Sequence, residues 1–341
     1  FGTIADTKNL KKKIFFAAML VGTVSCAALG VMTHWLAFLV VFVIAKIGYS
    51  SSIVFYDAML TDVTTEERMD DVSSHGYAWG YIGSCIPFGI GLALVLGGEK
   101  LGLSMQVSMG LTFLLTALWW FLVTIPLLRQ YKQENHGQIW KRSFGRLWKS
   151  LKEMRKEKHI FMFLLAFFFY IDGVYTIIEM ATAYGQSLGL DSTGLLLALL
   201  VTQLVAFPFC LIFAKLAKRF SGTKLITVCI VAYFCIAVYA IQLDRQIEFW
   251  ILAVCVGMFQ GGIQALSRSY FAKIIPAEKS GEYFGLLDIC GKGASFIGTT
   301  LMSVVSQLTG KVNFGVGAIA IIFVIGLILF RKAAALNSEK C

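Results

Sequence analysis

Long apolar segments separated by short polar connections run along almost the whole chain. Each segment is close to the roughly 20 residues that an α-helix needs to cross the hydrocarbon layer of a membrane. The ten predicted spanning helices are residues 14–32, 35–60, 75–97, 105–128, 160–184, 192–214, 225–243, 247–274, 282–308 and 313–330. The pattern therefore predicts an all-α polytopic membrane protein.

One long interruption divides this pattern, because residues 129–159 separate four predicted helices from six. We predict four parts: an N-terminal half at 1–128, a basic cytoplasmic linker at 129–159, a six-helix C-terminal half at 160–332 and a cytoplasmic tail at 333–341.

Within the linker, Trp140, Phe144 and Trp148 recur at helical spacing between Lys and Arg residues. This spacing favours an amphipathic helix that lies on the inner leaflet of the membrane. A solvated basic connector is the alternative.

The polar connections repeat at a constant spacing. Ala5 in GTIADTKNLKKK matches Ala217 in AKLAKRFSGTKL, and Glu66 in DVTTEE matches Glu278 in IIPAEK, with the same offset along the chain in both pairs. Two pairs of connections that share the same spacing indicate duplicated halves. The first half then has four helices where the second has six, and the chain starts at Phe1 rather than at Met. We therefore expect a truncated N-terminus, with about ten of twelve helices present.

Composition favours a membrane protein over a soluble one. Of 341 residues, 57% are apolar and 15% are charged, against about 45–50% and 25% in typical soluble domains, and the mean hydropathy is +0.75. In a soluble chain the net charge of +10 would suggest nucleic-acid binding, but here most Lys and Arg residues lie in the connections.

If the connections alternate between the two sides of the membrane, 24 of the 30 Lys and Arg residues lie on one side and three on the other. The positive-inside rule then places the N-terminal loop, the linker and the C-terminus in the cytoplasm, with the lipid bilayer rather than nucleic acid as partner.

The sequence lacks the motifs of metal sites, nucleotide sites and covalent catalysis. The eight cysteines have no C-x-x-C spacing, the four histidines form no ligand pattern, and G-x-x-x-x-G-K-[ST] does not occur. We therefore expect no metal and no cofactor. No Ser-His-Asp or paired-acid arrangement indicates an enzyme.

The first polar connection resembles a signature of the major facilitator superfamily of transporters, in which a Gly is followed by Ala-Asp and a basic cluster between the second and third helices. The matching residues are Gly2, Ala5, Asp6, Lys11, Lys12 and Lys13. The resemblance implies two pseudo-symmetric halves of six helices. It also implies that the acidic residue braces the halves near the start of the eleventh helix, which falls at residues 280–282 here. Gly2, Asp6 and Lys12 are therefore candidates for conformational control.

Three further segments are similar to one branch of that superfamily, the autophagy-related vacuolar amino-acid effluxers and their bacterial relatives. They are GYAWGYIGS at 76–84, FFFYIDGVYTII at 167–178 and GGIQALSRSYFAKIIPAEKSGEYFGLLDICGKGASFIG at 261–298. The similarity implies efflux or exchange of a small solute. In a bacterial member it implies the plasma membrane, because bacteria have no vacuole.

Three charged residues, Lys46, Asp172 and Lys292, fall near the middle of predicted helices. At 1.5 Å per residue, each lies about 16–18 Å from the start of its helix, in a hydrocarbon layer of roughly 30 Å. A charge there costs at least about 2.5–3.5 kcal/mol, so it normally faces a cavity or a partner. We predict that these residues line the transport path. In the alternative, Asp288 and Lys292 only neutralise each other at i,i+4 spacing.

Asp172 shares a face of its helix with Tyr175 and with a second acid, Glu179. Because two acids do not neutralise each other, we expect Asp172 to pair with Lys46, with Lys292 or with a proton. Its protonation would then depend on which cation approaches, which makes it a candidate coupling site. Glu179 lies about 28 Å along the helix. In the alternative interpretation it therefore lies at the outer mouth of the transport path.

A polar stripe marks the segment 247–274, where Gln260, Gln264 and Arg268 recur at helical spacing. We predict that this stripe lines the same cavity. Arg268 lies about six residues from the cytoplasmic end, so bracing a gate or extending to the interface are alternatives to ligand contact. Asp57, near the end of its own helix, has the same alternatives.

The sequence thus predicts a secondary active transporter that moves a small polar solute, for example an amino acid, by alternating access. Its predicted partners are the bilayer, the solute, and a proton or Na⁺ as candidate coupling ion. A non-transporting receptor or scaffold of the same fold, or a membrane-embedded enzyme, is the alternative.

Overall fold

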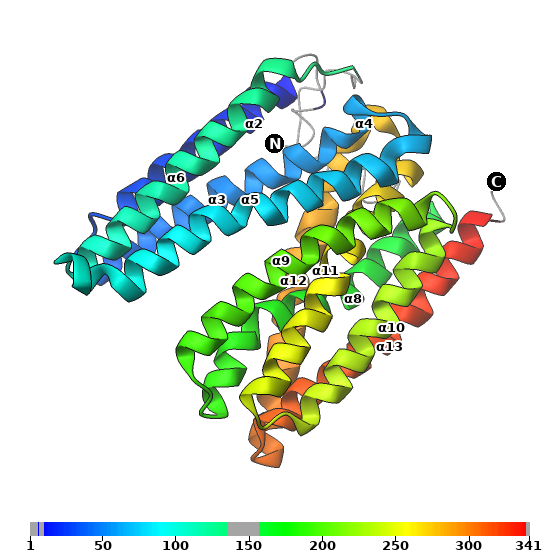
Figure 1. Cartoon of the computed structure of the whole chain (residues 1–341). Coiled ribbons are helices and arrows are strands. Elements are labelled where there is room, and N and C mark those ends of the chain that lie inside the picture. Colours follow the sequence, from blue (N-terminus) through cyan, green and yellow to red (C-terminus); the bar gives the residue numbers. More distant parts are fainter. Residues whose placement is uncertain (1–5, 7–9, 135–156, 339–341) are drawn as a thin grey trace. The chain divides into compact units, whose positions relative to one another are not determined.

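The computed structural model describes residue 6 and residues 10–134 and 157–338, without the side chains of 293–295. All regular structure in these ranges is helical (Figure 1), which confirms the predicted all-α class. The conformational candidate Gly2 and the predicted amphipathic stretch of the linker, with Trp140, Phe144 and Trp148, lie outside the described residues.

Ten long helices follow one another in the described ranges. They are α2 (Leu10–Leu29), α3 (Trp35–Ala58), α5 (Met69–Gly97), α6 (Met105–Gln130), α8 (Lys158–Ser187), α9 (Ser192–Ala217), α10 (Gly222–Tyr239), α11 (Gln246–Ile274), α12 (Ser280–Thr309) and α13 (Val312–Ser338). Shorter elements are α4 (Leu60–Val63) and the 3₁₀ turns η1 (Glu66–Arg68), η2 (Gly98–Leu101), η3 (Ala240–Gln242) and η4 (Ala277–Lys279).

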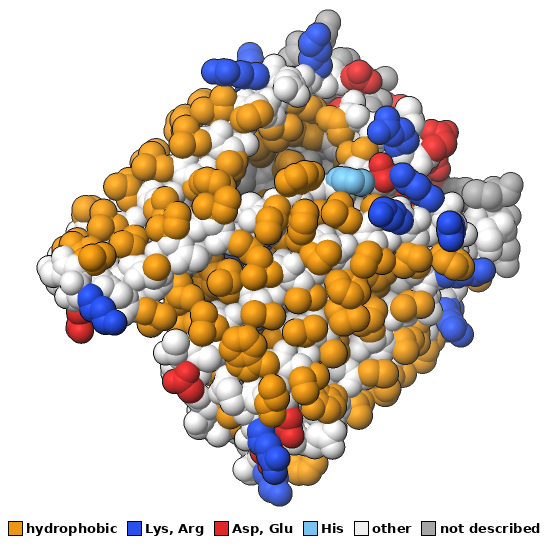
Figure 2. Space-filling model, viewed as in Figure 1, with side chains coloured by type: hydrophobic (Ala, Val, Ile, Leu, Met, Phe, Trp, Pro, Cys, Tyr) orange, Lys and Arg blue, Asp and Glu red, His pale blue; other side chains and the backbone are white. Residues whose placement is uncertain are grey.

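Nine helices in the described part of the chain are long and apolar enough to cross a membrane, judged by length and composition. The long helix outside this group is α12, which has 30 residues and carries Glu282, Asp288 and Lys292 in its first half. Exposed apolar side chains such as Val40 and Trp79 lie away from the helix ends. Apolar side chains cover much of the face seen in Figure 2, and charged side chains gather near helix ends. Apolar flanks of this kind are typical of helices that face lipid.

Several helices extend beyond the predicted spans. α5 begins at Met69 rather than at position 75, and α13 continues to Ser338 rather than ending at 330. Hydropathy marks only the part of a helix that lies in lipid. Asp70, in the first turn of α5, favours an earlier start because an acid interacts well with the positive end of a helix.

The helices repeat with the predicted spacing. The start of α10 lies about as many residues after the start of α2 as Ala217 lies after Ala5. The starts of α3 and α11 are separated by nearly the same number of residues. A 3₁₀ turn precedes α5 as another precedes α12, and the starts of these two helices are separated by nearly the same offset. The internal repeat is thus present in the order and spacing of successive helices.

The described residues fall into two compact units. The first unit takes residues from 1–65, 83–146 and 276–285, and the second takes them from 66–82, 147–275 and 286–341. The start of α5 therefore packs within the second unit and the start of α12 within the first, and these two segments are related by the repeat. The boundaries predicted after 128 and 159 stay a prediction.

Glycines bring α2 and α3 of the first unit into close contact. A Cβ atom at Gly48 would lie 2.5 Å from the backbone nitrogen of Gly22 and 2.9 Å from the carbonyl oxygen of Ala18. No larger side chain fits between these helices. Small residues commonly occupy such contacts in membranes, because they let two backbones approach closely.

Replacing Gly48 with Val should force α2 and α3 apart. Overpacking usually costs about 1–3 kcal/mol, so we expect a lower midpoint of thermal unfolding and less monodisperse protein in detergent. Gly89→Ala in α5 is the matched control, because a Cβ atom at Gly89 meets nothing within 4 Å. A Gly48→Val variant as stable as wild type would contradict this packing.

Aromatic side chains form the centre of the second unit, where α8 meets α11 and α13. The ring centroid of Phe163 lies 5.0 Å from that of Tyr270 and 6.2 Å from that of Phe330. The hydroxyls of Tyr170 and Ser267 are hydrogen-bonded at 2.7 Å. These contacts fix α8, the helix that carries Asp172.

Candidate functional site

Asp6 holds the first turn of α12 in the first unit. The side chain is buried, with an exposed fraction of 1%. Its Oδ1 accepts a hydrogen bond from the Gly281 N–H at 2.8 Å, and its Oδ2 accepts one from the Glu282 N–H at 3.0 Å. The first N–H groups of a helix have no partner within the helix, and the helix dipole favours an anion there. The predicted contact between Asp6 and residues 280–282 is therefore present.

A buried ion pair lies beside this contact. The Lys11 ammonium, 0% exposed, donates to Asp62 Oδ2 at 2.8 Å and to Ser280 Oγ at 2.9 Å. The Tyr131 hydroxyl donates to the same Asp62 oxygen at 2.5 Å. Burial and this hydrogen bond raise the pKa of the Tyr131 hydroxyl, so it stays protonated and remains a donor. Lys11 thus connects α2, α4 and the start of α12.

The structure places Lys11, rather than the predicted candidate Lys12, at the centre of this cluster. Lys12 is half-buried and, among the described residues, donates to the carbonyl oxygen of Tyr131 at 3.4 Å. The sequence shows three consecutive lysines but does not show which one faces inward. Asp62 is the first residue of DVTTEE, one of the connections that the internal repeat relates to each other. The repeat is therefore the sequence feature that could have indicated Asp62.

A second cluster attaches the start of α5 to the end of α11 within the second unit. Arg268 is 6% exposed, donates through Nε to Ser73 Oγ at 2.9 Å and through a terminal nitrogen to the Ser73 carbonyl at 3.1 Å. Its guanidinium lies 4.8 Å from the ring centroid of Tyr77. Asp70 accepts hydrogen bonds from Ser269 and Lys273, both at 2.6 Å.

These contacts bear on one of the three alternatives for Arg268, the extension of its side chain to the interface. A side chain that extends to the interface keeps its charged group in water, whereas this one is buried and bonded to the neighbouring helix. The contacts therefore disfavour extension to the interface, and the bracing role of Arg268 stays a prediction.

Lys218 stands in the second repeat where Asp6 stands in the first, since each directly follows one of the matched alanines, Ala5 and Ala217. Its Nζ lies 3.1 Å from Asp71 Oδ1 in the first turn of α5, with the two side chains 66% and 23% exposed. The second repeat therefore also contacts a helix start, with the charge inverted. Exposed ion pairs contribute at most about 1 kcal/mol, so the Asp6 contact is the stronger of the two.

Asp172 is fully buried and takes its partners from α8 and α12. Its Oδ1 accepts hydrogen bonds from the Gly298 N–H at 3.1 Å and from the Thr176 hydroxyl at 3.4 Å. Its buried Oδ2 has no hydrogen-bond partner among the described residues. A Cβ atom at Gly298 would lie 2.9 Å from Asp172 Oδ1, so glycine permits this approach.

Of the three partners expected for Asp172, which were Lys46, Lys292 and a proton, Lys292 does not pair with it in this structure. Lys292 instead donates to Asp288 at 2.6 Å, as the i,i+4 alternative predicted. Two residues that are four positions apart on one helix are neighbours on its surface. This pair therefore forms without any tertiary contact. Within the described part of the chain, Asp172 is left with hydrogen-bond donors on one carboxyl oxygen and none on the other.

The other predicted pathway residues are spread over both units. Gln264 accepts a hydrogen bond from the Tyr81 hydroxyl at 2.7 Å, and the buried Gln260 Oε1 has no partner among the described residues. The remaining residues in this group are Lys46 and Glu179, which are exposed, and Tyr175, which is half-buried. Asp57, the remaining candidate for gating, is also half-buried.

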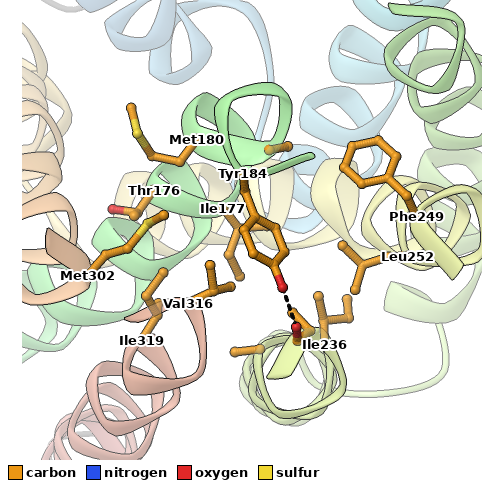
Figure 3. Close-up of a pocket in the computed structure, with 13 residues that line it drawn as sticks. Thr176, Ile177, Met180, Tyr184, Ile236, Phe249, Leu252, Met302, Val316 and Ile319 are labelled. Carbon is orange, nitrogen blue, oxygen red and sulfur yellow. Dashed lines mark hydrogen bonds between the residues drawn. The ribbon is translucent and has the colours of Figure 1, made fainter. Parts of the chain in front are cut away.

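An apolar cavity of ≈ 20 Å³ lies between helices of the second unit (Figure 3). Thr176, Met180 and Met302 line one part of it, and the Tyr184 hydroxyl beside it donates to the Ala240 carbonyl at 2.6 Å. A cavity of this volume has room for about one water molecule. It is therefore too small to be a solute site.

The same fold is found in solved transporter structures. A crystal structure of FucP, a major facilitator superfamily transporter of E. coli, in the outward conformation aligns over 95% of this chain and 83% of its own, with a TM-score of 0.69 and 18% sequence identity. At this identity the likeness shows the fold alone. The helices and their repeat thus have the fold of the major facilitator superfamily transporters.

The chain belongs to the family described as vacuole effluxer Atg22 like, whose model matches residues 61–340. It is 46% identical over 338 residues to the uncharacterized MFS-type transporter YxiO of Bacillus subtilis, which covers 96% of this chain and 78% of YxiO. It is 24% identical over 286 residues to autophagy-related protein 22 of Kluyveromyces lactis, covering 76% of this chain and 57% of that protein. The predicted resemblance is confirmed, and these relatives support a transporter rather than an enzyme.

Proposed function

We propose that this protein is a secondary active transporter that moves a small polar solute, such as an amino acid, by alternating access between its repeat-related halves. The observation that carries the proposal is the buried contact of Asp6 with the start of α12, 275 residues away in the sequence. A contact that joins the first repeat to the second can hold one access state and must break in the other.

The mid-membrane charges support a polar solute. Asp172, Asp288 and Lys292 lie within helices long enough to span the bilayer, and such residues usually mark a solute or ion path. Asp172 is a fully buried carboxyl group with one oxygen that no described residue contacts through a hydrogen bond. This geometry supports it as the site of a coupling proton.

The family and the charge distribution support a direction of transport and a location. Its description as vacuole effluxer supports export of the solute. A relative in Bacillus subtilis supports a bacterial plasma membrane. The excess of Lys and Arg on one side supports cytoplasmic termini.

Flux through purified protein in proteoliposomes tests this function. Vesicles preloaded with labelled L-amino acids should release them faster than protein-free vesicles, and the rate should respond to an imposed pH or Na⁺ gradient. Absence of flux for every solute tried would favour the receptor or scaffold alternative.

Asp6→Asn should shift the balance of access states and slow transport while leaving membrane insertion intact. The amide oxygen can still accept one N–H bond, but the charge at the helix start is lost, which costs up to about 2 kcal/mol in buried sites. Reaction of introduced cysteines with maleimides on each side of the membrane measures this balance. Lys218→Gln is the control, because its exposed ion pair contributes little. Unchanged labelling together with normal flux would show that Asp6 is not a brace.

A further inference from the structure

One end of the second unit carries cations without counter-charges. The four cations, which we call the basic surface, are Arg219 in the connection between α9 and α10, Lys224 in the first turn of α10, and Arg331 and Lys332 in the last two turns of α13. All four side chains are exposed, and none forms an ion pair in the described part of the chain. The segments 215–224 and 331–338 contain no acidic residue. The positive charge of the basic surface is therefore not neutralised locally.

The packing of α10 against α13 brings these cations to one level. Asn313, at the start of α13, donates to the carbonyl oxygens of Ile241 at 3.1 Å and Leu243 at 3.0 Å, just beyond the end of α10. The two packed helices are thus antiparallel. At 1.5 Å per residue, Lys224 and Arg331 lie about 26 and 27 Å from this contact. Lys and Arg side chains gather where α13 ends in Figure 1 (Figure 2).

Exposed apolar side chains adjoin the cations on the same helix faces. Val228 is exposed four residues after Lys224, and Ile328 is exposed four residues before Lys332. Residues with this spacing are neighbours on one face of a helix. Phe220, in the connection itself, is also exposed. Each helix therefore presents a cation at its end and an apolar flank one turn further into the span.

We propose that the basic surface binds the phosphate group of an anionic phospholipid in the adjacent membrane leaflet. Lys and Arg side chains near a membrane surface attract anionic headgroups, and they form charge-assisted hydrogen bonds with phosphate oxygens. The apolar flanks accommodate the acyl chains of the same lipid, which a soluble phosphate lacks. This arrangement favours a lipid over a free anion. The proposal needs the membrane-spanning helices but does not depend on transport.

Lipids that differ only in headgroup charge test this surface. Native mass spectrometry of the full chain in detergent measures the Kd of phosphatidylglycerol and of phosphatidylcholine with the same acyl chains. Wild type should bind phosphatidylglycerol more tightly. Lys224→Gln combined with Lys332→Gln should raise the Kd of phosphatidylglycerol about ten- to thirtyfold and leave that of phosphatidylcholine unchanged, because each Lys near an anionic headgroup contributes about fivefold.

Lys100→Gln combined with Lys311→Gln is the matched control, because it also removes two exposed lysines but at other helix ends. It should change neither Kd. Equal Kd values for the two lipids in wild type, or an equal rise in the test and control variants, would overturn the proposal. Displacement of phosphatidylglycerol by inorganic phosphate, compared with chloride at equal ionic strength, would show a site for a free anion and overturn the assignment to lipid.

Discussion

Asp172→Asn should abolish uphill transport driven by a pH gradient, while the protein still folds and exchanges solute across the membrane. The amide oxygen can accept the Gly298 N–H that Asp172 Oδ1 accepts now, so the contact between α8 and α12 is kept. An amide cannot bind and release a proton, however. The buried Oδ2, which has no hydrogen-bond partner among the described residues, is the atom on which we expect that proton to reside. Exchange survives in such a variant because the carrier never has to return empty.

The measurement compares counterflow with gradient-driven flux in the same proteoliposomes. Asp288→Asn is the matched control, since that acid also lies within a long helix of the bundle but is already bonded to Lys292, and it should keep the pH dependence. Asp172→Glu should retain part of the activity. An Asn variant that transports at the normal rate with the normal pH dependence would show that Asp172 is neither a coupling site nor an essential ligand.

Lys11→Met should lower the free energy of unfolding by about 3–5 kcal/mol, the usual cost of removing one partner from a buried ion pair. Without the ammonium group, the buried Asp62 loses its ion pair and keeps the hydrogen bond from the Tyr131 hydroxyl. Adding Asp62→Asn should recover much of the loss, because no uncompensated charge then stays buried. Denaturant unfolding in detergent measures all three proteins.

Lys12→Met is the control for this experiment. The Lys12 side chain is half-buried, and its Nζ lies 3.4 Å from a carbonyl oxygen, beyond the usual N–H···O range of about 2.7–3.2 Å. We therefore expect a loss below about 1 kcal/mol. Equal losses for the two lysines, or a double variant no more stable than Lys11→Met, would contradict the buried pair. A double-mutant cycle over Lys11 and Asp62 gives their coupling directly.

The candidate site was predictable where it depended on local spacing or on a family motif. The Asp288 and Lys292 pair follows from i,i+4 geometry, and the Asp6 contact with the start of α12 follows from the resemblance. The partner of Asp172 was not predictable, because Gly298 lies 126 residues away and offers a backbone N–H that every residue except proline possesses.

The sequence by itself determined the helical membrane class, the approximate spans and the repeat offset. These depend on apolar length and on spacing along the chain, which need no knowledge of neighbours. The tertiary structure alone decided which of three adjacent lysines is buried, and that Arg268 binds Ser73 of α5 rather than the interface. The reason is physical: the cost of burying a charge depends on the donors and acceptors that surround it, and packing brings these together from distant parts of the chain.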